Sequence, residues 1–250
     1  MKTKKFILTV FTLLLAVCIQ AQTTSSPKKI IIIDGHFFNQ IPVARENVAK
    51  VYILNAPSGA IAVGVELSTP LPEKALQYSV PIEQIPEGKL LLQRYNEAKG
   101  ANKGINISFK NERGLKAGDK FPDFSATDIQ GRKWTNADVK GKVMVLNLWF
   151  TGCGPCRSEM PELSEWKNEM PDVMFFSSTY EDAETAGRVL EKHRFNWIPI
   201  VNDTQFKEFV GSNGYPMTIV IDKEGIISKV EYGTSPLQRE ELKEKIQSLR

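Results

Sequence analysis

The stretch Val143–Arg157 reads VMVLNLWFTGCGPCR, and it decides the fold of the second half of this chain. The run Val143–Phe150 is almost continuously apolar, which is typical of a strand buried on both faces of a sheet. It ends abruptly at a C-x-x-C motif, and a helix-compatible segment follows. Cys153 and Cys156 are therefore expected at the start of a helix. There the unpaired N–H groups and the helix dipole favour thiolate over thiol.

The cysteine count narrows the chemistry of this motif. The chain has three cysteines, and Cys18 lies in an N-terminal segment expected to be removed, so one pair remains. One pair cannot build a disulfide framework. A zinc site needs about four ligands, and His36 and His193 are far apart in sequence. Haem attachment needs His directly after the second Cys, where Arg157 stands. The pattern predicts a redox-active dithiol with no metal and no cofactor; two buried, inert thiols are the alternative.

The N-terminus has the pattern of a secretory signal peptide. Lys2, Lys4 and Lys5 precede the uncharged apolar run Phe6–Ile19, which is short for a membrane span of about 20 residues. Ala21 suits the position before a cleavage site. The sequence therefore predicts a signal peptide over residues 1–21 and an extracytoplasmic, periplasmic location.

A second interpretation of this segment is a lipoprotein signal. Leu15–Cys18 resembles a lipobox, in which Cys18 would carry a lipid anchor, although Val17 stands where that box prefers a small residue. We favour the soluble secreted form. Both interpretations place the protein in an oxidising compartment, where a free dithiol needs an external source of electrons, such as a membrane electron donor.

The charge balance argues against nucleic-acid binding. The chain has 32 basic and 29 acidic residues, and the signal segment holds three Lys and no acid, so 32 − 3 = 29 basic residues remain against 29 acidic ones. The net charge of +3 therefore belongs to the targeting segment. No nucleic-acid partner is expected.

The first half of the remaining chain is predicted to be rich in β-strands. Ala60–Leu67 and Lys89–Tyr95 are strand candidates, and apolar residues alternate with polar ones over Ile105–Lys110. Several prolines between positions 70 and 86 argue against long helices. We expect a small, sandwich-like β domain. The predicted organisation is a signal peptide (1–21), a leader (22–29), a β-rich domain of unknown role (30–112), a linker (113–118) and an α/β domain (119–250).

The second half alternates strands and helices. Ser235 and Pro236, with Gln238 three residues after the cap, are a strong helix start. Pro161 is expected to kink the helix that contains it. Strands are predicted over 143–150, 173–179, 217–221 and 226–232, and helices over 157–170, 182–194, within 201–210, and from 236 onward.

The second half also resembles a known family. The matching pieces are Lys120–Phe124 (KFPDF), Val145–Trp149 (VLNLW), the CGPC motif, Arg157–Pro161 (RSEMP) and Tyr215–Thr218 (YPMT). In order and spacing they resemble the extracytoplasmic thiol–disulfide oxidoreductases of the TlpA/ResA type, over about residues 116–250. The resemblance implies a thioredoxin-like α/β fold, with a central mixed sheet flanked by helices.

Two positions depart from the pattern of that family. Its members usually carry Trp immediately before the first Cys, where this chain has Gly152. Thioredoxin itself has a buried Asp at the position of Asn147. In the TlpA/ResA type the acid lies three residues after the second Cys, which here is Glu159. Because Gly152 stands where the family usually has Trp, substrate contacts near the dithiol are expected to differ.

The motif residues receive distinct expected roles. Cys153, first in the motif, is expected to be exposed and to attack a substrate disulfide, and Cys156 would then release the reduced product. Glu159, if buried, would have a raised pKa and could accept and return the Cys156 proton; the alternative is a Glu that complements the helix dipole. The resemblance implies that Pro216 is a cis-proline facing the dithiol. Tyr215 and Trp149 are expected to contribute to substrate binding.

The expected function is that of a thiol–disulfide oxidoreductase. It would reduce disulfide-bearing exported proteins, and by family analogy it would take part in cytochrome c biogenesis. A peroxiredoxin-like peroxidase is an alternative, but it needs Thr three residues before the reactive Cys, and Thr151 is two before. A non-enzymatic binding module carried by the β domain is another alternative.

Overall fold

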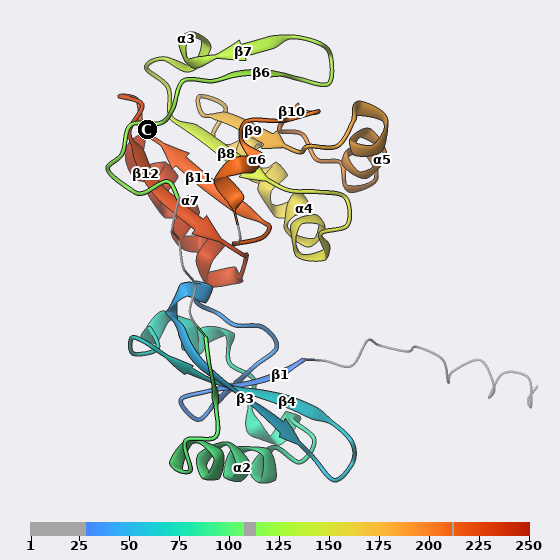
Figure 1. The fold of residues 1–250 in the computed structure, drawn as a ribbon, viewed down its shortest axis with the longest axis vertical. Coiled ribbons are helices and arrows are strands. Elements are labelled where there is room, and N and C mark those ends of the chain that lie inside the picture. Colours follow the sequence, from blue (N-terminus) through green and yellow to red (C-terminus); the bar gives the residue numbers. More distant parts are fainter. Residues whose placement is uncertain (1–28, 108–113, 212) are drawn as a thin grey trace, which may run out of the picture.

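A computed structural model of the chain describes residues 29–107, 114–211 and 213–250. The predicted signal peptide with Cys18, nearly all of the leader, and residues 108–113 between the two halves lie outside the described residues. We call residues 29–107 the N-terminal part and residues 114–250 the C-terminal part. Each contains a five-stranded sheet, and Figure 1 shows the N-terminal part below the C-terminal part.

The sheet of the C-terminal part is mixed, with β8 at its centre. Strand β8 pairs in parallel with β9 and antiparallel with β11. This is the central mixed sheet expected of a thioredoxin-like fold, and that prediction is confirmed. In spatial order, the strands are β10 (Ile198–Ile200), β9 (Met174–Ser178), β8 (Met144–Leu148), β11 (Met217–Ile221) and β12 (Ile227–Tyr232).

Both faces of this sheet are covered. Val145 and Val220 belong to a core shared with α4, α5 and α7, whereas Leu146 and Ile219 belong to a second core on the other face. Every residue of β8 and of β11 is buried. This explains why the sequence of β8 is apolar without alternation. The helices are α3 (Asn136–Val139), α4 (Gly154–Glu169), α5 (Ala183–His193), α6 (Lys207–Val210) and α7 (Pro236–Leu249), and β6 (Ser125–Thr127) pairs with β7 (Lys133–Thr135).

The N-terminal part is built on a single sheet. In spatial order, its strands are β2 (His36–Phe38), β1 (Ile30–Ile33), β4 (Ile61–Leu67), β3 (Val48–Asn55) and β5 (Ile105–Asn106). Three short 3-10 helices are η1 (Arg45–Asn47), η2 (Glu73–Tyr78) and η3 (Ile82–Gln84), and one longer helix is α2 (Gly88–Gly100). The predicted β-rich character is confirmed, but the sandwich is wrong, because a helix takes the place of a second sheet.

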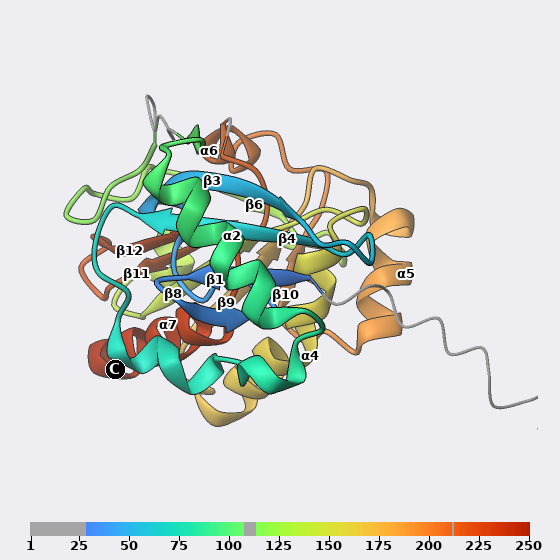
Figure 2. The ribbon, with the colours of Figure 1, turned by 90° about the horizontal axis from the view of Figure 1, so that it is seen from below.

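Helix α2 covers one face of the N-terminal sheet. Leu91 and Tyr95 lie four residues apart on the same helix face and are buried against Tyr52 and Leu54. The strand expected over Lys89–Tyr95 is therefore wrong: this apolar spacing fits a helix better than a strand. Figure 2, seen from below, shows α2 in front of β3 and β4, on the face that points away from the C-terminal part.

The described helices include none with the length and apolar character that a membrane crossing would need.

Candidate functional site

The dithiol lies where β8 ends and α4 begins. Cys153 is the N-cap residue of α4, Pro155 occupies the first turn, and the two cysteines form a disulfide with their Cα atoms 5.3 Å apart. The backbone N–H of Cys156 donates to Cys153 Sγ at 3.2 Å. This N–H belongs to the group that a helix start leaves without intrahelical partners. A thiolate on Cys153 would therefore be stabilised by the helix that follows it.

The two cysteines are both largely buried. Cys153 is 5% exposed and Cys156 is 1% exposed. The order of exposure agrees with the sequence, but Cys153 is not the open residue that was expected. The reason is its place in the core beside Trp149, against which Phe150 and Tyr215 also pack. Only a small part of the Cys153 surface is therefore accessible to a substrate sulfur.

Glu159 lies one turn beyond Cys156 and is 4% exposed. Its carboxylate accepts a hydrogen bond from Asn147 Nδ2 at 3.0 Å, and the same amide group donates to Thr218 Oγ1 at 3.1 Å. Asn147 is on β8 and Thr218 is paired with it on β11. Asn147, which departs from thioredoxin in the sequence, thus connects the buried acid of α4 to the sheet.

Burial changes the proton affinity of Glu159. Removal of the carboxylate from water raises its pKa to about 7, while hydrogen bonds from Thr234 and Asn147 and the charge of Arg239 act in the opposite direction. A carboxyl group with such a pKa can exchange a proton near neutral pH.

Pro216 lies at the same edge of the sheet as the dithiol. The Tyr215–Pro216 peptide bond is cis, and the antiparallel register pairs Met217, the next residue, with Leu148 at the end of β8. Pro216 is buried and Tyr215 is half-buried. Strand pairing therefore brings the 215–216 segment to the end of β8 from which the C-x-x-C motif leaves.

Three aromatic rings gather beside the motif. The ring of Phe150 lies 5.2 Å from that of Tyr215, in an edge-to-face arrangement, and 6.3 Å from that of Tyr180. The Tyr180 side chain is 44% exposed. A Cβ placed at Gly152 would come within 2.7 Å of the Phe150 ring. Phe150 thus occupies the space next to the position where the family usually carries Trp.

The sequence did not single out Glu181. Its carboxylate accepts hydrogen bonds from the Thr151 backbone N–H at 2.7 Å and from Thr151 Oγ1 at 2.6 Å. The loop between β8 and the first Cys is thereby attached to the segment that follows β9. An acid three residues after a strand end gives no distinctive pattern, so only the fold shows the contact.

Trp149 does not lie where a substrate-binding residue would. It is 1% exposed and belongs to the core that contains both cysteines. Direct contact with a substrate, as expected from the sequence, does not agree with this burial. The position follows from the register of β8, which turns Trp149 toward α4. Within the described residues its indole N–H has no hydrogen-bond partner.

The described residues contain no group of three or more His, Cys, Asp or Glu arranged to hold a metal ion.

Known proteins resemble a little over half of this chain. The thioredoxin-like protein YneN of Bacillus subtilis is 28% identical over 142 residues, which cover 55% of this chain and 82% of YneN. The thiol–disulfide oxidoreductase ResA of Geobacillus thermodenitrificans is 28% identical over 148 residues, which cover 57% of this chain and 83% of ResA.

A solved structure shares the fold. The thiol:disulfide interchange protein DsbE of Chlorobium tepidum superposes with a TM-score of 0.50 at 23% identity, over 54% of this chain and 99% of DsbE. The family model for Redoxin matches residues 116–246, which contain the dithiol, Glu159 and Pro216. The chain belongs to the redoxin family, and it carries the dithiol of a thiol–disulfide oxidoreductase.

Proposed function

We propose that this chain reduces disulfides of exported proteins, with Cys153 and Cys156 as its redox centre. The observation that carries the proposal is the Cys153–Cys156 disulfide at the start of α4, in a region that matches the redoxin family. The resemblance to proteins named thiol–disulfide oxidoreductase ResA supports the same chemistry.

The reaction transfers two electrons from the dithiol to the substrate. The Cys153 thiolate attacks one sulfur of the substrate disulfide, and a mixed disulfide forms as the first substrate thiolate leaves. The Cys156 thiolate then attacks Cys153 Sγ, which releases the second substrate thiolate. The enzyme is left as the Cys153–Cys156 disulfide, and an external dithiol donor must reduce it before the next cycle.

Glu159 is proposed to hold the proton of Cys156. It lies on the same helix one turn further on, it is buried, and its pKa is raised to about 7 by that burial. It would accept the proton when Cys156 becomes the attacking thiolate and return it when the disulfide is reduced. The two released substrate thiolates take their protons from solvent.

Tyr215 and Pro216 are proposed to border the substrate site. They lie at the sheet edge from which the motif leaves, and Tyr215 packs edge-to-face on Phe150. An extended substrate segment would lie along Tyr215 and Pro216 with its disulfide at Cys153.

The compartment and the partners are also part of the proposal. The basic and apolar pattern of residues 1–21 supports export to the periplasm, either as a soluble protein or anchored by a lipid on Cys18. In that oxidising compartment the reduced dithiol would be maintained by a membrane electron donor. Exported proteins with disulfides, including those of cytochrome c biogenesis, are the proposed substrates.

A peroxidase function finds little support in the site. The Thr151 hydroxyl donates to Glu181 and is thereby directed away from a peroxide-activating role. Thr151 also precedes the motif by two residues rather than three.

The redox potential of the cysteine pair tests the proposed direction. The mature protein would be equilibrated in graded dithiothreitol or glutathione buffers and its thiols trapped. A potential near the thioredoxin value of about −270 mV supports a reductase, whereas a value near about −120 mV would reverse the direction to disulfide formation.

Trapping of intermediates tests the roles of the two cysteines. Cys156→Ser should accumulate a mixed disulfide with a disulfide-bearing protein, because the resolving thiol is missing. Cys153→Ser should form none. Equal trapping by both variants would contradict the assignment of Cys153 as the nucleophile.

A further inference from the structure

The Glu159 carboxylate is held from the segment that begins α7. The Thr234 side chain lowers the pKa of this carboxyl group by hydrogen bonding, and Arg239 Nη1 donates to Thr234 Oγ1 at 2.8 Å. Arg239 Nε donates to Glu162 Oε2 at 2.7 Å, and the Arg239 side chain is only 15% exposed. Arg239 therefore joins Thr234 to α4 close to Glu159. The charged groups that act on Glu159 are Arg239, which favours its ionised form, and Glu162, which opposes it.

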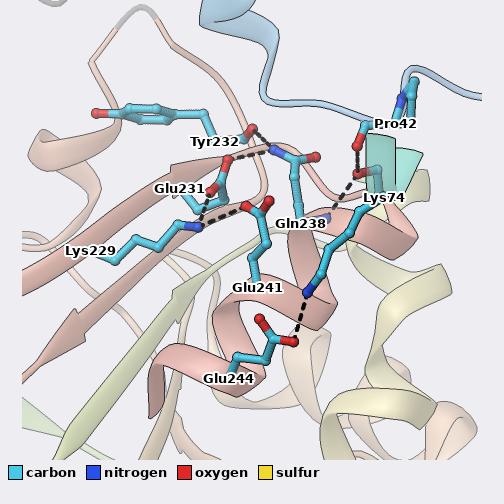
Figure 3. Close-up of polar contacts among 9 residues, drawn as sticks. Pro42, Lys74, Lys229, Glu231, Tyr232, Gln238, Glu241 and Glu244 are labelled. Atoms are coloured by element: carbon cyan, nitrogen blue, oxygen red, sulfur yellow. Dashed lines mark hydrogen bonds and ion pairs between the residues drawn. The ribbon is translucent and has the colours of Figure 1, made fainter. Parts of the chain in front are cut away.

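The start of α7 is fixed to the N-terminal part by Ser235. This residue is fully buried, and its hydroxyl caps α7 by accepting from the Gln238 N–H at 3.2 Å. The same hydroxyl donates to the carbonyl oxygen of Pro42 at 3.0 Å. The Gln238 side chain in turn donates to Glu231 at 2.6 Å and to the Tyr232 carbonyl at 3.1 Å. Figure 3 shows this network between the end of β12, the start of α7 and Pro42.

A second contact attaches η2 to the exposed side of α7. Glu240, the residue after Arg239, accepts hydrogen bonds from the Tyr78 hydroxyl at 3.0 Å and from Gln77 Nε2 at 3.2 Å. Lys74 Nζ donates to Glu244 at 2.9 Å, one turn further along (Figure 3). The N-terminal part thus contacts residues on both sides of Arg239.

A third contact lies beside Tyr215 and Pro216, which are proposed to border the substrate site. The Arg45 guanidinium, from η1, lies 5.3 Å from the centre of the Tyr232 ring. Its Nη1 is 3.6 Å from the point where a Cβ at Gly214 would lie. Gly214 immediately precedes Tyr215 and Pro216. The same face of the N-terminal part therefore reaches both the α7 start and the 214–216 segment.

We propose that Thr234 and Arg239 are positioning residues for Glu159, and that the N-terminal part holds them in place through Pro42 and η2. This inference rests on the proposed proton role of Glu159. It assigns the N-terminal part a function that needs no chemistry of its own: it fixes the hydrogen-bond donors that set the proton affinity of the buried acid.

The direct test is titration of the Glu159 carboxyl carbon by 13C NMR in the full oxidised protein, with the signal assigned by its absence in Glu159→Gln. In Thr234→Val a donor to the carboxylate is lost while shape is kept, so the titration midpoint should rise by about one pH unit. An unchanged midpoint in Thr234→Val would overturn the positioning role.

The contribution of the N-terminal part is tested at its own surface. The double variant Lys74→Ala/Tyr78→Phe removes contacts to α7 without touching the dithiol site, and it should raise the midpoint by about 0.3 pH units, a fraction of the direct effect. The matched control is Lys243→Ala, which loses an ion pair of 2.7 Å between α7 and Glu169 within the C-terminal part. Equal midpoints in the double variant and the control would overturn the role of the N-terminal part.

Single-turnover reduction of a disulfide peptide by the reduced protein, followed from pH 5 to 9, separates this inference from the proposed function. The inflection that coincides with the NMR midpoint should move with it in Thr234→Val and disappear in Glu159→Gln, while the inflection that reports ionisation of Cys153 remains in both variants. A rate profile identical in Glu159→Gln and the parent would reject the proton role of Glu159, whatever the NMR midpoint. Loss of the inflection there, with no shift in Thr234→Val, would reject only the positioning inference.

Discussion

The two five-stranded sheets of this chain differ in how their faces are covered. In the C-terminal sheet, every residue of β8 and of β11 is buried between two cores. In the N-terminal sheet, α2 covers one face, while the side chains of Ile53, Ile61 and Ile105 are 57%, 61% and 59% exposed. Glu159, the proposed proton-holding residue, packs in the C-terminal part, and its burial raises its pKa.

Among substitutions that test this comparison, the largest change in the free energy of unfolding is expected in the C-terminal sheet, which is covered on both faces. Leu146 on β8 has no exposed surface. Leu146→Ala should lower the free energy of unfolding by about 2–5 kcal/mol, since it loses apolar burial and leaves a cavity. Urea unfolding followed by circular dichroism measures the change. A loss below about 1 kcal/mol would show that this face of the sheet is loosely packed.

A pH-dependent effect is expected at the buried acid. The pKa of Glu159 rises from 4.5 to about 7 in the folded protein. Between these values the folded chain keeps the proton while the unfolded chain releases it, so stability falls as pH rises through this window. Glu159→Gln cannot ionise and should gain on the order of 3 kcal/mol relative to the parent between pH 4 and pH 8.

Urea unfolding of both oxidised proteins at the two pH values measures this difference. Glu165→Gln, at an exposed position of the same helix, is the matched control for the loss of one acid. A Glu159→Gln difference that is equal at pH 4 and pH 8 would contradict the raised pKa.

A smaller effect, confined to the N-terminal sheet, is expected at α2. The Tyr95 hydroxyl donates to the Val65 carbonyl at 2.9 Å, and Tyr95 is 1% exposed. Tyr95→Phe leaves that carbonyl without its partner and should cost about 1–3 kcal/mol. Hydrogen exchange should quicken for the amides of β4 and remain unchanged for those of β8. Equal acceleration in both strands would mean that the two sheets unfold as one unit.

The smallest effect is expected on the open face. Ile61→Thr keeps the β-branched shape that a strand favours, and Ile61 is already 61% exposed. The change in unfolding free energy should stay within about 0.5 kcal/mol. A loss above about 1 kcal/mol would show that this face is covered in solution, and size-exclusion chromatography would then report a second copy.

The same difference explains what the sequence could predict. The uninterrupted apolar run of β8, and Ser235 and Pro236 at the start of α7, predicted those elements, because burial on both faces and helix capping leave local signals. The sequence predicts a strand over Lys89–Tyr95, because over so short a stretch the four-residue spacing of a helix is hard to tell from alternation, whereas the structure has helix α2 there. Thr234 and Arg239, which lower the pKa of Glu159, lie more than 70 residues from it in the sequence. Only tertiary structure brings them together.

The Phe150 ring beside Gly152 has an evolutionary consequence. The space beside the motif holds only one aromatic side chain from these two positions, since any side chain at 152 would collide with the Phe150 ring. They should therefore change together among relatives. A chain with Trp at 152 should carry a small residue at 150, and a chain with a large aromatic residue at 150 should carry Gly at 152. This chain uses the second solution, in which the aromatic surface beside the dithiol comes from the end of the strand rather than from the residue next to the first cysteine.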